Sequence, residues 1–122
     1  MNIREATTTD KSRWNHFVAT NAGGSFVQSW EWADFYATQK DKVWRFIIED
    51  GQEWLAVIFL FRSKLKLGQS ILYAPRGPVI GDKYRGEKAV IFELIMRTID
   101  ELAVRNGALH FQVDPSVVVH RN

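Results

Sequence analysis

The run WLAVIFLF, residues 54–61, constrains the fold of this chain more than any other feature. It is rich in β-branched and aromatic residues and has no polar face, which is typical of a central strand covered on both sides. A second run of this kind, VWRFIIE (43–49), precedes it, and EDGQE between the two is a hairpin-turn signal. The sequence therefore predicts an antiparallel hairpin in the middle of a layered structure.

Further elements follow from periodicity and from turn residues. Apolar residues recur at helical spacing in three segments, and a strand-like run, SILYA, follows the hairpin after Gly68 and Gln69. Proline, glycine and aspartate in residues 75–82 predict a loop. The expected elements, in chain order, are a strand at 2–6, helices at 11–20 and 28–39, the two hairpin strands, a strand at 70–74, a helix at 84–106 and a strand at 108–113.

This order predicts the topology and the number of domains. Three consecutive strands joined by short turns must be antiparallel, whereas the strand after the long helix can return parallel to its neighbour. A chain of 122 residues is long enough for one hydrophobic core but not for two, and it contains no repeat or linker. We therefore expect residues 1–122 to form a single α/β domain, with a mixed, mainly antiparallel sheet flanked by helices.

Composition narrows the classes of function. The formal charge of +2 is too small to indicate a dedicated nucleic-acid binder, so an anionic partner would need a local site. The absence of cysteine excludes disulfides and thiolate catalysis, and is compatible with a reducing compartment. The sequence shows no bilayer-spanning apolar run and no signal peptide, which favours the cytoplasm. The three histidines, His16, His110 and His120, lack metal-ligand spacing, and we predict neither a metal site nor a catalytic residue.

The stretch YAPRGPV, residues 73–79, is the most suggestive candidate site. Pro75 and Pro78 fix their own φ angles and restrict the residues before them, and Gly77 permits close backbone approach. The loop would hold Arg76 at the end of a strand, where its guanidinium could form paired hydrogen bonds to a phosphate or a carboxylate. Alternatively, Arg76 bonds backbone carbonyls or an acidic neighbour and holds the loop in place.

The element order resembles the first part of the GNAT acyltransferase fold. The blocks GSFVQSWEWADF (24–35), KVWRFIIEDG (42–51), LYAPRGPV (72–79) and FQVDP (111–115) are similar to the opening domain of the FemAB/FemX family of peptidoglycan aminoacyltransferases. This resemblance covers nearly the whole chain. It implies a GNAT-like domain truncated after the strand that follows the long helix, the first of two such domains, and inactive by itself.

The resemblance also implies substrates. The complete enzyme would move an amino acid from aminoacyl-tRNA to the stem peptide of a UDP-linked or lipid-linked muropeptide. Arg76 would contribute to muropeptide binding, with Tyr73, Tyr36, Lys40 and Lys42 as further candidates. Family members often carry a lysine near the end of the second helix; Tyr36 stands there, and Lys40 and Lys42 could substitute for it or be surface lysines.

Other interpretations stay open. GNAT enzymes that use acetyl-CoA bind its pyrophosphate on a Q/R-x-x-G-x-G/A loop, but here RGEKAV (85–90) places Lys88 and Val90 at the two small positions. We therefore expect no cofactor, and an acetyltransferase is the weaker alternative. The second alternative is a non-catalytic module that dimerises through an exposed sheet edge.

Two groups of side chains also have more than one interpretation. Alternating Arg62, Lys64 and Lys66 could contact an anionic membrane or protect a strand end. Trp30, Trp32, Phe35 and Tyr36 are predicted to pack in the core. Tyr36 is the one of the four that could most readily stack on a ligand ring instead.

Overall fold

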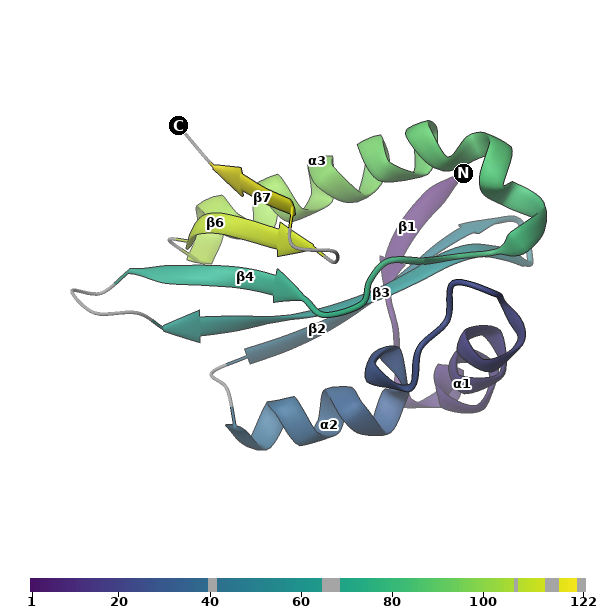
Figure 1. Cartoon of the computed structure of the whole chain (residues 1–122), viewed down its shortest axis with the longest axis horizontal. Helices are drawn as coiled ribbons and strands as arrows, with labels where there is room; N and C mark the ends of the chain where they lie inside the picture. The colour runs from purple at the N-terminus through teal and green to yellow at the C-terminus, as the bar shows by residue number, and fades with distance from the viewer. Residues whose placement is uncertain (40–41, 65–68, 107, 114–116, 121–122) are drawn as a thin grey trace.

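The computed structural model of this chain describes residues 1–39, 42–64, 69–106, 108–113 and 117–120. Its strands form one mixed sheet in the spatial order β1-β2-β3-β4-β6-β7, and β5 pairs with β3 off this path. Helix α3 covers one face of the sheet, and helices α1 and α2 cover the other (Figure 1). The strands are β1 (Asn2–Glu5), β2 (Lys42–Asp50), β3 (Glu53–Lys64), β4 (Ser70–Ala74), β5 (Val79–Ile80), β6 (Ala108–Val113) and β7 (Val117–His120); the helices are α1 (Lys11–Thr20), α2 (Trp30–Gln39) and α3 (Lys88–Asn106).

The predicted hairpin forms the centre of the sheet. Strands β2 and β3 pair antiparallel along their whole length and turn at Gly51, whose φ of 63° suits a residue without a Cβ. Eight consecutive residues of β3, from Trp54 to Phe61, are buried, as expected of a strand covered on both faces. Strand β4 pairs antiparallel with β3, and β6 pairs parallel with β4 after α3 crosses over. The mainly antiparallel sheet flanked by helices is therefore confirmed.

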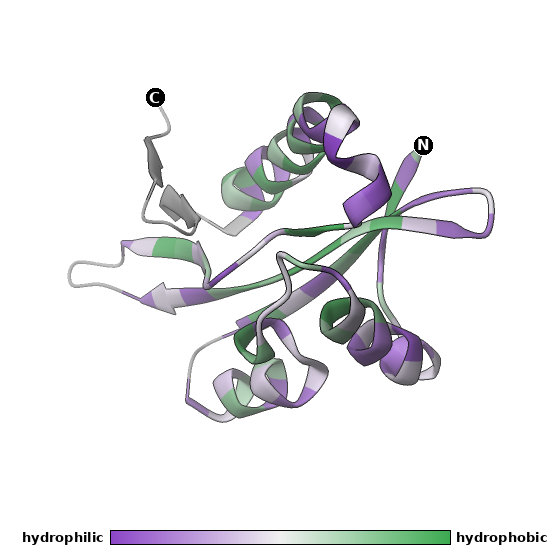
Figure 2. Cartoon of the chain, turned by 45° about the vertical axis from the view of Figure 1, so that its right-hand side comes forward, coloured by the Kyte–Doolittle hydropathy of each residue, from purple (hydrophilic) through white to green (hydrophobic). Residues whose placement is uncertain are grey.

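Alternation along the strands divides the buried residues into two cores. Ile48, Ile58 and Leu60 point to the α3 side, where they pack against residues of that helix including Ile91, Ile95 and Ile99. Neighbouring positions in the strands point to the other side, where Ile47, Val57 and Phe59 pack with Trp14, Trp30 and Trp54. Hydrophobic residues concentrate in the central strands, between the two helical layers (Figure 2). Each helix layer is thus held by one face of the same hairpin.

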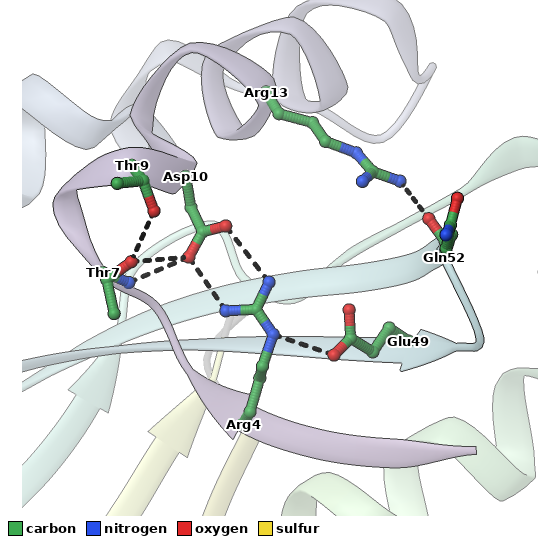
Figure 3. Close-up of polar contacts among 7 residues, drawn as sticks. All are labelled: Arg4, Thr7, Thr9, Asp10, Arg13, Glu49 and Gln52. Atoms are coloured by element: carbon green, nitrogen blue, oxygen red, sulfur yellow. Dashed lines mark hydrogen bonds and ion pairs between the residues drawn. The ribbon is translucent and has the colours of Figure 1, made fainter.

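Polar contacts hold the N-terminal strand and α2 against the sheet. Arg4 on β1 donates two hydrogen bonds to the carboxylate of Asp10, at 2.9 and 3.1 Å, and a third to Glu49 on β2 at 2.8 Å (Figure 3). The guanidinium lowers the pKa of Asp10 to about 2. On the same face of the sheet, Arg45 of β2 stacks on the ring of Trp30, 3.9 Å from its centroid, and donates to the Trp30 carbonyl.

Several elements differ from the sequence prediction. Helix α2 begins at Trp30 rather than residue 28, because residues Phe26–Gln28 form a 3₁₀ turn. The loop predicted at 75–82 contains the short strand β5, and the long helix begins at Lys88 after the 3₁₀ segment Asp82–Glu87. The sequence also predicts Val90 on the apolar face of this helix, which is wrong, because Val90 lies in the first turn of α3 and is 57% exposed. Strand β7 pairs antiparallel with β6 and was not predicted.

Candidate anion-binding site

The YAPRGPV stretch leaves the sheet as a sharp turn that exposes one side chain. Strand β4 ends at Ala74, and β5 begins at Val79, so residues 75–78 connect two segments that both pair with β3. Pro75 and Gly77 are buried, whereas Arg76 between them is exposed and has a φ of 55°. This left-handed conformation is uncommon for an arginine, and it turns the side chain outward between two buried neighbours. The turn therefore presents a cation on a fixed backbone.

The side chain of Gln28 lies beneath this turn and is completely buried. Its Nε2 donates to the carbonyl of Pro75, and its Oε1 accepts from the backbone N–H of Phe59 at 2.9 Å. Gly77 lies directly on the same amide: a Cβ built there would be 2.9 Å from Nε2. A side chain at position 77 would therefore require either the buried Gln28 amide or the turn to shift.

A second set of contacts holds the end of the turn. The carboxylate of Asp82 accepts from the backbone N–H of Ala22 at 3.0 and 3.1 Å, and the Asp82 N–H donates to the side chain of Asn21 at 2.8 Å. Residues 21–28, the connection between α1 and α2, therefore touch both ends of the segment 75–82. The sequence gives no sign of this pairing, since the two segments lie about fifty positions apart.

A pocket of about 220 Å³ opens beside the turn. Three cationic side chains line it: Arg76 from the turn, Arg85 from the 3₁₀ segment before α3, and Lys88 from the first residue of α3. Its remaining lining residues are Gly23, Gly77, Pro78, Ile80 and Phe92, so no carboxylate lines it within the part of the chain that the structure describes. Asp82 stands just outside and pairs with Arg85 at 3.1 Å. Helix N-termini carry a partial positive charge and free N–H groups, so this position of α3 also favours an anion.

The charge of the neighbouring Lys83 is already matched by an acidic partner. Lys83 forms an ion pair with Glu53, which raises the pKa of the lysine and lowers the pKa of the glutamate. A hydrogen bond to the same carboxylate raises the pKa of Tyr84. Lys83 also does not line the pocket, whose positive charge comes from Arg76, Lys88 and Arg85, the last of these shared with Asp82.

The structure separates the other predicted site residues from Arg76. Tyr73 and Tyr36 lie on the α1/α2 side of the sheet, on either side of Phe61: the rings of Tyr36 and Phe61 stack at 4.4 Å, and Tyr73 meets Phe61 edge-on at 5.5 Å. Lys42 lies over the ring of Trp44, which belongs to the core on the α3 side. Lys40 lies outside the described residues. Of the four that the structure describes, Arg76 alone lines the pocket.

The aromatic residues of α2 are partly buried and partly exposed. Trp30 is in the core, as expected, with only 5% of its surface exposed. Phe35 is 49% exposed, so core packing was wrong for this residue, while Trp32 and Tyr36 are half-buried. Trp32 contacts Phe26, Phe35 and Tyr36 within 6.3 Å between ring centroids. Together these four residues form an aromatic surface along α2.

Sequence reasoning missed three residues that shape the pocket. Arg85 and Lys88 were considered only as parts of an unsuitable acetyl-CoA loop, although their spacing of three at a helix start is a signal for a shared direction. Gln28 was taken as the first residue of a helix, where polar residues are common. Its role depends on a contact with Pro75, 47 positions away, which no local pattern could indicate.

Comparison with known structures defines the class of fold. The structure of the aminoglycoside 6'-N-acetyltransferase AAC(6')-IG from Acinetobacter haemolyticus matches over 93% of this chain and 79% of its own, with a TM-score of 0.67 and 11% identity. An acetyltransferase from Vibrio fischeri matches over 98% of this chain and 100% of its own, with a TM-score of 0.64 and 15% identity. The predicted GNAT-like fold is therefore confirmed.

The family follows from the sequence itself. The family model described as the FemAB family matches residues 9–122. The crystal structure of FemX matches over 93% of this chain with a TM-score of 0.75 and 21% identity. No curated protein matches the sequence significantly. The chain belongs to the FemAB family, which confirms the resemblance of its motifs, and it spans 27% of the FemX chain.

Proposed function

We propose that this chain is the first GNAT-like domain of a non-ribosomal aminoacyltransferase, which transfers an amino acid from aminoacyl-tRNA to the stem peptide of a peptidoglycan precursor. Its membership of the FemAB family carries this proposal. The chain corresponds to about a quarter of FemX, so we expect it to contribute binding rather than the whole reaction. In the complete enzyme, positioning of the amine and stabilisation of developing charge would supply the catalysis.

The pocket beside Arg76 is the proposed binding site for the muropeptide carrier. A UDP-linked or lipid-linked muropeptide contains a diphosphate, and the three cations and the α3 N-terminus match an anion of this kind. Tyr73, Tyr36, Lys40 and Lys42 would then act away from the phosphates, on the sugar or peptide portions. The protein would work in the cytoplasm, where such precursors are made. Within the described residues, no helix has the length and apolarity needed to cross a membrane.

Titration of the labelled chain with UDP-MurNAc-pentapeptide, followed by NMR, tests this site. We expect shifts at residues 76–78 and 85–88, and we expect Arg76→Ala to weaken binding ten-fold or more, because hydrogen bonds to a charged partner are worth roughly 1.5–3 kcal/mol. Arg97→Ala is the matched control: this exposed α3 arginine pairs with Glu93 outside the pocket. Equal effects of the two substitutions, or shifts with acetyl-CoA alone, would refute the assignment.

A protein-interaction module is a second candidate, favoured by the aromatic surface of α2. Phe26 is 71% exposed and Phe35 is 49% exposed, which is unusual for two neighbouring aromatic side chains. A second copy of the chain could cover this surface or pair with a sheet edge. Size-exclusion chromatography with light scattering separates the candidates: a monomer at high concentration contradicts the dimer, whereas a dimer that Phe35→Ser dissolves would support it.

A further inference from the structure

The register of the sheet shows why the turn needs a partner from elsewhere in the chain. Strand β4 pairs with β3 through Phe61↔Tyr73, and β5 pairs with β3 through Val57↔Val79. Continuing the β4 register by two residues would place Pro75 opposite Phe59. A proline has no N–H, so it cannot donate to the Phe59 carbonyl, and the chain turns away from β3 at this point. Phe59 pairs with Arg45 of β2 on one side, but on the β4/β5 side its backbone groups would be left without a strand partner.

The amide of Gln28 takes the place of that missing strand. It accepts from the Phe59 N–H at 2.9 Å and donates to the Phe59 carbonyl at 3.4 Å, as a peptide group of a neighbouring strand would. The same Nε2 donates to the carbonyl of Pro75, the residue before Arg76. One buried side chain thus bridges the central strand and the turn, with both polar atoms used.

Gln28 is itself fixed from its own backbone. Its carbonyl accepts from the indole of Trp14 at 2.8 Å, and its N–H donates to Ser25 in the 3₁₀ turn at 2.8 Å. Trp14 and Gln28 are both completely buried. The contact between the Gln28 amide and Gly77 limits how closely the turn can approach β3. The position of Arg76 therefore depends on Gln28 rather than on the length or sequence of the turn alone.

We infer that Gln28 is the positioning residue of the anion pocket: its amide substitutes for a strand neighbour of Phe59 and thereby holds Arg76 in its outward, left-handed conformation. The identity of the ligand rests on the proposed function, but the effect of Gln28 on the turn does not. Without the amide, Pro75 has no anchor to β3, and the turn should move on the fast timescale that NMR order parameters report.

Gln28→Met tests this inference, because it keeps an unbranched side chain of similar length but removes both hydrogen-bonding atoms. The control is Ile99→Ala, a core substitution towards the C-terminal end of α3 that also destabilises the fold. We expect order parameters of Arg76 and Gly77 near 0.85 in the wild type and in Ile99→Ala, and below about 0.6 in Gln28→Met. We also expect the dissociation constant for inorganic pyrophosphate to rise at least ten-fold in Gln28→Met, and less than two-fold in Ile99→Ala.

Gln28→Glu supplies a conservative rescue with a pH signature. Burial raises the pKa of such a carboxyl group, and its protonated form has one donor for Pro75 and one acceptor for the Phe59 N–H. Its ionised form presents only acceptors to two carbonyls. The turn of Gln28→Glu should therefore be ordered at pH 5 and become mobile by pH 8, while the wild type and Gln28→Met show no such trend.

The outcomes separate this inference from the proposed function. A wild-type chain that binds neither pyrophosphate nor the muropeptide would refute the anion site, and the order parameters would still decide the role of Gln28. A rigid turn in Gln28→Met, or equal mobility in Gln28→Met and Ile99→Ala, would overturn the inference. Restored order in protonated Gln28→Glu would support it.

Discussion

Single residues with polar contacts between distant segments contribute to the specificity of this fold. Gln28 fills a gap in the sheet, Asp82 ties the turn to the α1–α2 connection, and Arg4 joins β1 to its neighbours. Gln28 replaces a contact that a neighbouring strand would otherwise provide, whereas Arg4 and Asp82 add contacts between segments that are far apart in the sequence. Removal of Gln28 leaves the buried backbone groups of Phe59 without these hydrogen bonds, so its substitution should cost more than the mean surface change.

Asp10 gives a prediction about pH. Its folded-state pKa of about 2 lies below the ordinary value of 3.8, so its ionised form stabilises the fold. The contribution is complete above the unfolded pKa and is lost as the pH falls from about 4 to about 2. We expect Asp10→Asn to lower the free energy of unfolding by about 1–2 kcal/mol at pH 7, and by less near pH 2.5.

Urea unfolding at several pH values measures this difference. Asp50→Asn is the control, since Asp50 is 71% exposed and pairs with the N-terminus at 3.6 Å. The free energy of unfolding of Asp50→Asn should depend on pH in the same way as that of the wild type. An Asp10→Asn chain that loses as much stability on acidification as the wild type would show that the Arg4 cluster contributes nothing.

At the scale of elements, the glycine pair of the α1–α2 connection gives a matched comparison. A Cβ on Gly24 would lie 1.7 Å from the backbone oxygen of Val18, whereas no atom lies within 4 Å of a Cβ on Gly23. The obstructing atom belongs to the backbone of α1, so α1 or the connection would have to move. We expect Gly24→Ala to destabilise the chain by about 2–3 kcal/mol and Gly23→Ala by less than about 0.5 kcal/mol.

Urea unfolding of the two variants at pH 7 tests this prediction. If Gly24→Ala proves as stable as Gly23→Ala, the close approach of the connection to the end of α1 does not occur in solution. Residues 21–28 form one side of the proposed site, so NMR shifts of Gly77 should move in the Gly24 variant and stay in place in the Gly23 variant.

At the scale of the whole molecule, the two cores share one hairpin. Ile47 and Ile48 are adjacent, completely buried, and point to the α1/α2 core and the α3 core respectively. Replacing either with alanine should cost about 2–5 kcal/mol. Because β2 and β3 belong to both cores, we expect a single unfolding transition in each variant.

Tryptophan fluorescence and far-UV circular dichroism check this prediction. Trp44 belongs to the α3 core, so the fluorescence is measured with Trp44→Phe in every chain, where Trp14, Trp30 and Trp54 report on the α1/α2 core, and circular dichroism follows the whole backbone. The two midpoints should coincide in both variants. A fluorescence transition that moves in Ile47→Ala but stays in place in Ile48→Ala would mean that the two layers unfold independently.

The parts of the fold that could be predicted are those determined locally. The hairpin, α1 and the strands β4 and β6 follow from residue patterns within one segment, and all were predicted. The role of Gln28 could not be predicted, because its side chain occupies a position beside Phe59 where the β-ladder is interrupted. That interruption arises only when the fold brings Pro75 to the level of Phe59. Lys88 and Arg85 could not be joined to Arg76, since the 3₁₀ segment between β5 and α3 determines their direction. Strand β7 has four residues, too few for a period to be recognised.

The return of the chain to β3 after the turn has a consequence for how this surface can change. The segment 75–78 joins β4 to β5, and both of these strands pair with β3, so the sheet fixes both of its ends. A substitution at position 76 must accept a φ of 55° and gives up the contacts of the arginine side chain, but the buried residues on either side can keep their places. Glycine and asparagine tolerate that angle and remove the charge, which makes this tip the natural place to redesign or diversify ligand choice without rebuilding the scaffold.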